Sequence, residues 1–169
     1  MRFFFLLLFF TLSSAFAKPC GLEGTIAERI KECDQTKGHF VLVVANEKGV
    51  EIYKDTKSGL IWGNRIKSDF NHYGSQMACQ GDVHGYELLK DLKWRLPTIN
   101  EFSAAAAHGM KDVLSSMDHT YWSSTGVKRS RYRRRRGPPA QVYLWDGSEG
   151  KTDTGDIKDA ASVRCVARE

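Results

Sequence analysis

The chain has 169 residues, of which 41% are hydrophobic and 27% are charged, and its formal net charge is +5. This length is sufficient for one domain with its own hydrophobic core. Beyond the N-terminus no apolar stretch is long enough for a membrane helix, which excludes a protein with several helical spans.

The first 17 residues have the pattern of a secretory signal peptide. Arg2 supplies the positive start, residues 3–12 are apolar, and Ala15 and Ala17 form a small-x-small cleavage site. We therefore predict an exported protein, periplasmic or secreted. A retained membrane anchor is the alternative, but the apolar run is short for a bilayer.

Four cysteines follow the predicted cleavage site: Cys20, Cys33, Cys79 and Cys165. In an oxidising compartment an even number of cysteines predicts disulfides, and four allow three connectivities. One of the three joins Cys20 to Cys33 as a short staple and Cys79 to Cys165. A zinc site is the rival interpretation, but no Cys-x-x-Cys pair is present.

The first half of the chain predicts a short helix followed by strands. Residues 22–33 carry a short helical pattern. Residues 40–45 form a β-branched apolar run, residues 46–49 are typical of a turn, and residues 50–53 alternate, which together predict a hairpin. A second turn at residues 55–59 precedes a strand at 60–62.

The second half predicts helices and then strands. Residues 71–92 are expected to be partly helical. Thr98 and Glu101 have the spacing of a capping box, which predicts a helix that ends near Gly109. A second short helix is expected at residues 110–117. The predicted strands are 120–125, 141–145 and 162–166.

The positive charge of the chain is concentrated in residues 128–136, KRSRYRRRR. Without the signal peptide the charge is +4, from 24 Lys and Arg against 20 Asp and Glu, and without this run it is −3. The run is bracketed by Gly126 and by Gly137-Pro138-Pro139, so it is predicted to be a loop between two strands. Its cationic residues are Lys128, Arg129, Arg131, Arg133, Arg134, Arg135 and Arg136.

The run is interpreted as a polyanion-binding loop. The planar guanidinium group matches sulfate, phosphate and carboxylate groups, and six of the seven cations are arginines. Tyr132, within the run, is expected to stack on a base or a sugar ring. Two other interpretations remain open: a solvated loop without a ligand, and a site of proteolytic cleavage.

Four sequence blocks resemble those of a bacterial exported family. They are DTKSGLIW at residues 55–62, WRLPTINEF at 94–102, YWSST at 121–125 and VRCV at 163–166. They resemble, in the same order, the blocks of the DUF1566 domain, also called the C-terminal domain of the Legionella collagen-like adhesin. The resemblance covers residues 55–168; the chain departs from the family in its lack of collagen-like repeats and in its arginine-rich loop.

The resemblance implies a C-type-lectin-like α+β fold. In such folds a cysteine on a helix pairs with one on the last strand, which matches Cys79 and Cys165, and leaves Cys20 with Cys33. The adhesin domain of the family binds sulfated polysaccharides. The family is also distantly related to formylglycine-generating enzymes, but no residue of this chain indicates their catalytic activity.

The remaining candidate residues are weaker. Trp62, Trp94 and Trp122 are expected to be core, whereas Trp145 is as much a candidate for stacking on a sugar as for the core. Calcium is the usual lectin cofactor, and Asp146, Glu149, Asp153 and Asp156 could hold an ion, although a solvated acidic loop is favoured. The histidines, His39, His72, His84, His108 and His119, lack metal-ligand spacing, and no catalytic motif is present.

Together these observations predict a signal peptide at 1–17, an N-terminal segment with a helix and a hairpin at 18–54, and a DUF1566-like domain at 55–169. The fold class is α+β, a C-type-lectin-like single domain with short helices and a twisted antiparallel sheet, disulfide-bonded. We expect a binding protein for anionic polysaccharide, lipopolysaccharide or nucleic acid, without enzymatic activity, metal or cofactor. The alternative is an envelope protein-interaction or structural module that docks on an acidic protein partner.

Overall fold

A computed structural model of the chain describes residues 36–37, 39–45, 50–81, 89, 91–127 and 141–168. The predicted signal peptide, the helical pattern at residues 22–33, the predicted Cys20–Cys33 pair and the basic residues 128–136 lie outside the described residues. None of the described helices combines the length and the apolar character that a membrane span requires.

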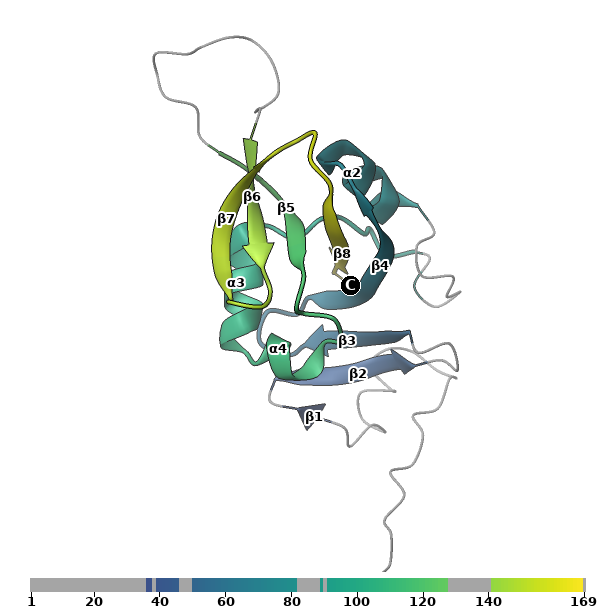
Figure 1. The fold of residues 1–169 in the computed structure, drawn as a ribbon. Coiled ribbons are helices and arrows are strands. Elements are labelled where there is room, and N and C mark those ends of the chain that lie inside the picture. The colour runs from purple at the N-terminus through teal and green to yellow at the C-terminus, as the bar shows by residue number, and fades with distance from the viewer. Residues whose placement is uncertain are drawn as a thin grey trace, which may run out of the picture.

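The described strands form one mixed sheet in the order β1-β2-β3-β4-β8-β5-β6-β7 (Figure 1). The prediction of an α+β chain is confirmed, but the purely antiparallel sheet is wrong, because β5 and β8 pair in parallel at Tyr121 and Ser162. Strand β8 follows β7 in the chain but is not its neighbour in the sheet, so no hairpin joins β8 to β5 and forces the two to be antiparallel. The strands are β1 (Thr36–Lys37), β2 (Phe40–Ala45), β3 (Glu51–Asp55), β4 (Ile61–Phe70), β5 (Thr120–Gly126), β6 (Gln141–Asp146), β7 (Lys151–Asp156) and β8 (Ala161–Ala167).

The predicted hairpin near the N-terminus is confirmed, since β2 and β3 pair antiparallel. The next turn is closed by hydrogen bonds from the Asp55 amide to Leu60 O and from the Gly59 amide to Asp55 O, both at 2.8 Å. Gly59 has φ +70°, a left-handed conformation that side chains disfavour. Strand β4 follows this turn and runs to Phe70.

Both faces of the sheet are buried at its central strands β5 and β8, because successive side chains of these strands enter two different hydrophobic clusters. On β8, Val163 and Cys165 enter one cluster and Val166 enters the other. On β5, Trp122 enters the first cluster, with Val163 and Cys165, and Tyr121 enters the second, with Val166. The central strands therefore need helices on both sides.

Helix α2 (His72–Gln80) covers one face of the sheet. It begins at Asn71, whose side chain accepts a 2.8 Å hydrogen bond from the Gly74 amide. Near its end, Cys79 is fully buried and joined by a disulfide to Cys165 on β8. The predicted pairing of these two cysteines is confirmed.

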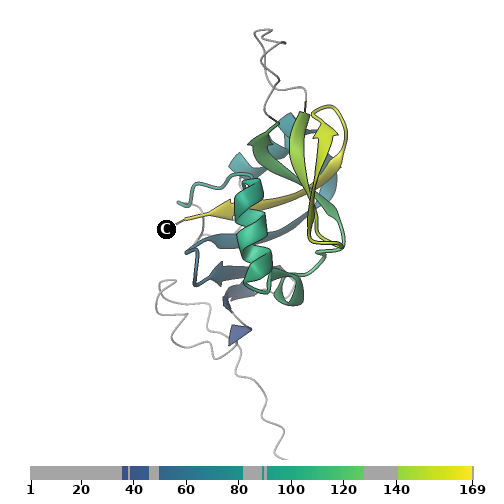
Figure 2. The same cartoon turned by 90° about the vertical axis from the view of Figure 1, so that its left-hand side faces the viewer.

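Helix α3 (Ile99–Ala107) lies across the opposite face of the sheet (Figure 2). Its Phe102 belongs to the hydrophobic cluster that contains Tyr121 and Val166. The predicted capping box is confirmed: the Glu101 amide donates to Thr98 Oγ1 at 3.2 Å, and the Thr98 amide donates to the Glu101 carboxylate at 2.8 Å. Both guanidinium nitrogens of Arg95 also donate to that carboxylate, at 2.8 and 2.6 Å. Helix α4 (Met110–Val113) is shorter than predicted, because Leu114 already has extended backbone.

We expect Thr98→Ala to lower the free energy of unfolding by roughly 1 kcal/mol, because the Glu101 amide loses its partner at the helix start. Urea denaturation measures the change. Ser103→Ala is the matched control: its hydroxyl donates to Ile99 O within the same helix, so its loss leaves no amide unpaired. Equal stability of Thr98→Ala and Ser103→Ala would contradict the capping role.

Candidate functional site

The predicted ligand-binding residues Lys128, Arg129, Arg131, Tyr132, Arg133, Arg134, Arg135 and Arg136 lie outside the described residues. The described residues show where their segment is attached. β5 and β6 are antiparallel neighbours, and beyond the last pair of the ladder the Val127 amide donates to Gln141 O at 3.1 Å. Residues 128–140 therefore connect adjacent ends of two hydrogen-bonded strands, and the residues that flank this connection, Val127 and Gln141, are joined by a hydrogen bond.

The sheet beside this point of attachment is acidic. Gln141 lies opposite Asp156 on β7, the last strand of the sheet. Asp153, Asp156 and Asp159 are all exposed, and Lys158 is the exposed cation of this turn. The positive charge of this region therefore comes from the basic segment itself and not from the sheet that carries it.

Trp145 lies in the core and offers no ring face to a ligand. It is 3% exposed and stacks on Phe102 of α3, with ring centroids 5.8 Å apart and an interplanar angle of 4°. The assignment of Trp145 to ligand binding is therefore corrected. Trp62, Trp94 and Trp122 are also buried, as predicted.

Asp146 organises the turn between β6 and β7. Its Oδ1 accepts hydrogen bonds from the Ser148 hydroxyl at 2.6 Å and from the amides of Ser148 and Glu149 at 2.9 and 3.1 Å. These hydrogen bonds, the Ser148 hydroxyl first, lower the pKa of the Asp146 carboxyl. Among the described residues no group of three or more His, Cys, Asp or Glu side chains is placed to hold a metal ion. The candidate ion ligands Asp146, Glu149, Asp153 and Asp156 therefore do not form such a group.

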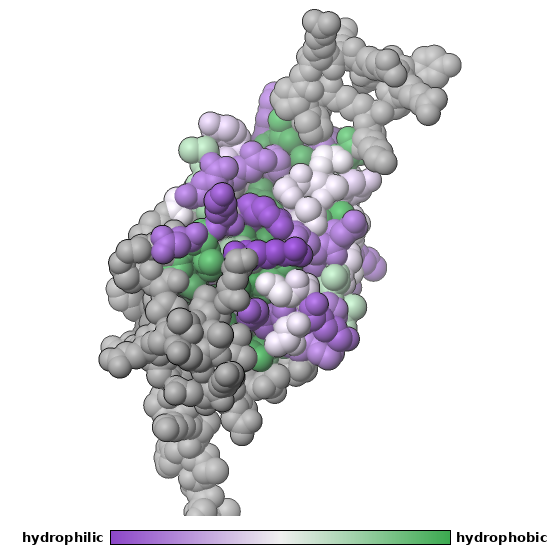
Figure 3. Space-filling model, turned by 180° about the vertical axis from the view of Figure 1, so that it is seen from behind, coloured by the Kyte–Doolittle hydropathy of each residue, from purple (hydrophilic) through white to green (hydrophobic). Residues whose placement is uncertain are grey.

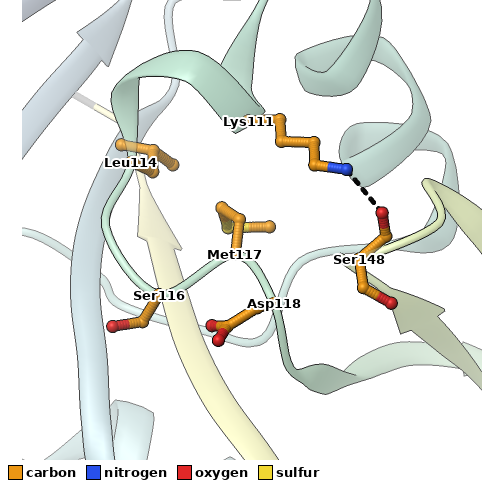
Figure 4. A pocket seen from close by; sticks show the side chains of 6 residues that line it. All are labelled: Lys111, Leu114, Ser116, Met117, Asp118 and Ser148. Carbon is orange, nitrogen blue, oxygen red and sulfur yellow. Dashed lines mark hydrogen bonds between the residues drawn. The ribbon is translucent and has the colours of Figure 1, made fainter.

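An open pocket of about 520 Å³ lies at the other end of β5 and β6 (Figure 4). One wall is the connection before β5, with Leu114, Ser116, Met117 and Asp118, and the other is Ser148 of the β6–β7 turn. The ammonium group of Lys111 spans the walls and donates to Ser148 O. Since β5 rises about 3.4 Å per residue, roughly 20 Å separates this pocket from the hydrogen bond between Val127 and Gln141, where residues 128–140 are attached.

Arg164 of β8 supports the wall of this pocket that is formed by the connection before β5. Its side chain is 1% exposed and donates to Gly63 O at 2.7 Å and to the Ser115 carbonyl. The Tyr121 hydroxyl donates to the Ser116 carbonyl, and the guanidinium group lies over the Tyr121 ring at 5.7 Å. Burial lowers the pKa of the guanidinium group. These bonds account for an arginine in the core: it supports the connection before β5.

The structure brings together two histidines that sequence spacing did not connect. The His39 and His108 rings lie 5.7 Å apart, nearly perpendicular to each other. His108 Nδ1 is 2.7 Å from Oδ2 of the fully buried Asp55. Burial alone would raise the pKa of the Asp55 carboxyl, but hydrogen bonds from Ser58, His108 and the Lys57 amide lower it.

One face of the described surface is mostly polar. On the face seen in Figure 3, hydrophilic residues predominate and hydrophobic ones form small separate areas. Among the described residues, the exposed large hydrophobic side chains are Tyr73 and Met77 on α2. No patch of the size that marks an obligate protein interface is therefore evident on this face.

No family model fits the chain, and no curated protein matches it.

Proposed function

We propose that this protein is an exported, non-enzymatic binding protein that recognises anionic polymers through the arginine-rich segment 128–136. The candidate ligands are sulfated or acidic polysaccharide, lipopolysaccharide and nucleic acid. The observation that carries the proposal is the concentration of seven cations on one connection, whose flanking residues Val127 and Gln141 are joined by a hydrogen bond on the sheet.

This attachment favours a polymer over a single small anion. All seven side chains belong to one short connection, so once one guanidinium group engages a polymer the others act at high effective concentration. Each neutralised anionic group also releases counterions from the polymer. Since the mature chain without the segment carries −3, the rest of the protein contributes little long-range attraction, and binding depends on the segment.

We further propose that the chain is a DUF1566-like, C-type-lectin-like domain. Support comes from the way the four resembling blocks meet in space. Trp62 of the first block and Arg95 of the second both pair with Val166 of the fourth. The Ser124 amide of the third donates to Pro97 O of the second at 2.7 Å. If the four blocks belong to one domain of this family, they are expected to contact one another in this way.

The test compares the wild-type chain with two variants of equal charge. In the first, Arg133, Arg134, Arg135 and Arg136 are replaced by Ser. In the second, four exposed lysines of the described surface are replaced by Ser: Lys57, Lys67, Lys93 and Lys158. Binding to immobilised heparin and to single-stranded DNA is measured at low salt, with circular dichroism to establish that each variant folds.

We expect the arginine variant to lose ten-fold or more in affinity for heparin, and the lysine variant to retain most of it. Equal losses would show that net charge alone drives binding, and the assignment of the segment would be wrong. If neither polymer binds wild type but an acidic envelope protein does so through the segment, the protein-interaction module is the correct function.

A further inference from the structure

We infer that His39 and His108 form a binding site for one divalent transition-metal ion of the kind that prefers imidazole, such as Zn²⁺. This inference is independent of the basic segment and of polyanion binding. It rests on the placement of the two rings, on the buried carboxylate behind one of them, and on ring nitrogens that have no hydrogen-bond partner among the described residues.

Three elements bring the pair together. His39 immediately precedes β2, Asp55 ends β3, and His108 caps the C-terminus of α3. The backbone fixes the first two, because Phe40 pairs with Asp55 and the Thr56 amide donates to His39 O at 2.8 Å. α3 is packed on the same cluster as Phe40 through Phe102. The two histidines are therefore held by the core and not by a chance meeting of surface loops.

Asp55 sets the tautomer of His108. Its Oδ2 accepts a 2.6 Å hydrogen bond from the Ser58 hydroxyl and lies 2.7 Å from His108 Nδ1, while Oδ1 accepts from the Lys57 amide at 3.0 Å. A carboxylate only accepts hydrogen bonds, so His108 Nδ1 carries the proton. The lone pair of His108 is then on Nε2. A ligating histidine typically donates its other N–H to a carboxylate in this way.

The second ring lies at a suitable distance. With metal–nitrogen bonds of about 2.0–2.1 Å, two imidazoles on one tetrahedral ion have centroids about 5–6 Å apart. The observed 5.7 Å separation falls within this range. Among the described residues, neither ring nitrogen of His39 nor His108 Nε2 has a hydrogen-bond partner.

Access and coordination number follow from the surroundings. The His108 side chain is 17% exposed and His39 is partly exposed, so an ion can reach the pair from solvent. The described residues offer no cluster of three or more ligands, and Asp55 is engaged behind His108. Water would complete the coordination, as in sites that keep open positions.

The test is a calorimetric titration of the full chain with Zn²⁺ alone. Two variants each remove one ligand: His39→Ala, and His108→Asn, whose amide N–H can still donate to Asp55. His119→Ala is the matched control, since His119 is also partly exposed and its ring neighbour is Tyr121, not another histidine. We expect wild type and the control to bind one ion with equal affinity, and each ligand variant to bind at least ten-fold more weakly.

A second measurement separates ligation from a structural effect. Zn²⁺ should shift the ¹⁵N resonance of His108 Nε2 and raise the melting temperature of wild type, because an ion that binds only the folded state stabilises it. If His108→Asn fails to fold, His39→Ala decides alone. The proposal is overturned if wild type binds no Zn²⁺ at millimolar concentration, or if His39→Ala binds as tightly as wild type.

Discussion

Replacing Cys79 and Cys165 together with alanine is expected to lower the free energy of unfolding by about 4 to 5 kcal/mol. The disulfide closes a long loop, with a sequence separation of 86 residues, and in the chain-entropy model the stabilisation grows with the length of the loop. The bond also ties α2 to β8 within one hydrophobic cluster. A loss of this size is a large part of the total stability of an ordinary domain.

Urea denaturation of the double variant and of wild type measures the effect. Alanine is preferred to serine because both cysteines are fully buried, and a serine hydroxyl would add an unpaired polar group. The m-value should rise in the variant, since its unfolded chain is no longer cross-linked and exposes more surface. A loss below about 1 kcal/mol, with an unchanged m-value, would mean that the bond contributes little in solution.

Gly147→Ala is expected to cost about 3 kcal/mol, at the upper end for overpacking. A Cβ at this position would lie 2.1 Å from Met117 O and 2.9 Å from Met117 C. Both are backbone atoms, so no side-chain rotation relieves the clash. The β6–β7 turn would have to move away from the connection before β5, which breaks the 2.9 Å hydrogen bond from the Gly147 amide to His119 O.

Gly81→Ala is the matched control for this prediction. Among the described residues its added Cβ would meet Ala78 O and Met77 O, both at 3.8 Å, and its φ of −75° suits any residue. Thermal unfolding of the two variants should show a clear fall in melting temperature for Gly147→Ala and a change within about 0.5 kcal/mol for Gly81→Ala. Similar values for the two would show that the turn relaxes without cost.

The strands that could be predicted are those with apolar side chains to bury. β2, β5, β6 and β8 each place β-branched or aromatic residues in the core, and this apolar pattern predicts all four strands. β7 was missed because its sequence, KTDTGD, has no apolar alternation. It is a strand because it pairs along its whole length with β6. Its buried residue is Gly155, where a Cβ would lie 2.7 Å from Leu144 Cδ1.

Tertiary contacts account for the errors at the candidate sites. Trp145 stands next to a turn, which is compatible with an exposed ring, but Phe102 of a distant helix covers it. His39 and His108 meet only because β2, β3 and α3 converge on Asp55, so no local spacing connects them. The capping box and the Cys79–Cys165 pair could be predicted, the first from local chemistry and the second from a resemblance.

The salt dependence of heparin binding tests the central claim most directly. If wild type engages about four to six anionic groups, log affinity should fall with log salt concentration at a slope of roughly −3 to −5. The variant with Ser at positions 133, 134, 135 and 136 should give a shallower slope, because it releases fewer counterions, while the variant with four surface lysines replaced should keep the wild-type slope. Equal affinity and equal slope for wild type and the arginine variant would mean that the segment is only a solvated loop, which would contradict the proposed function.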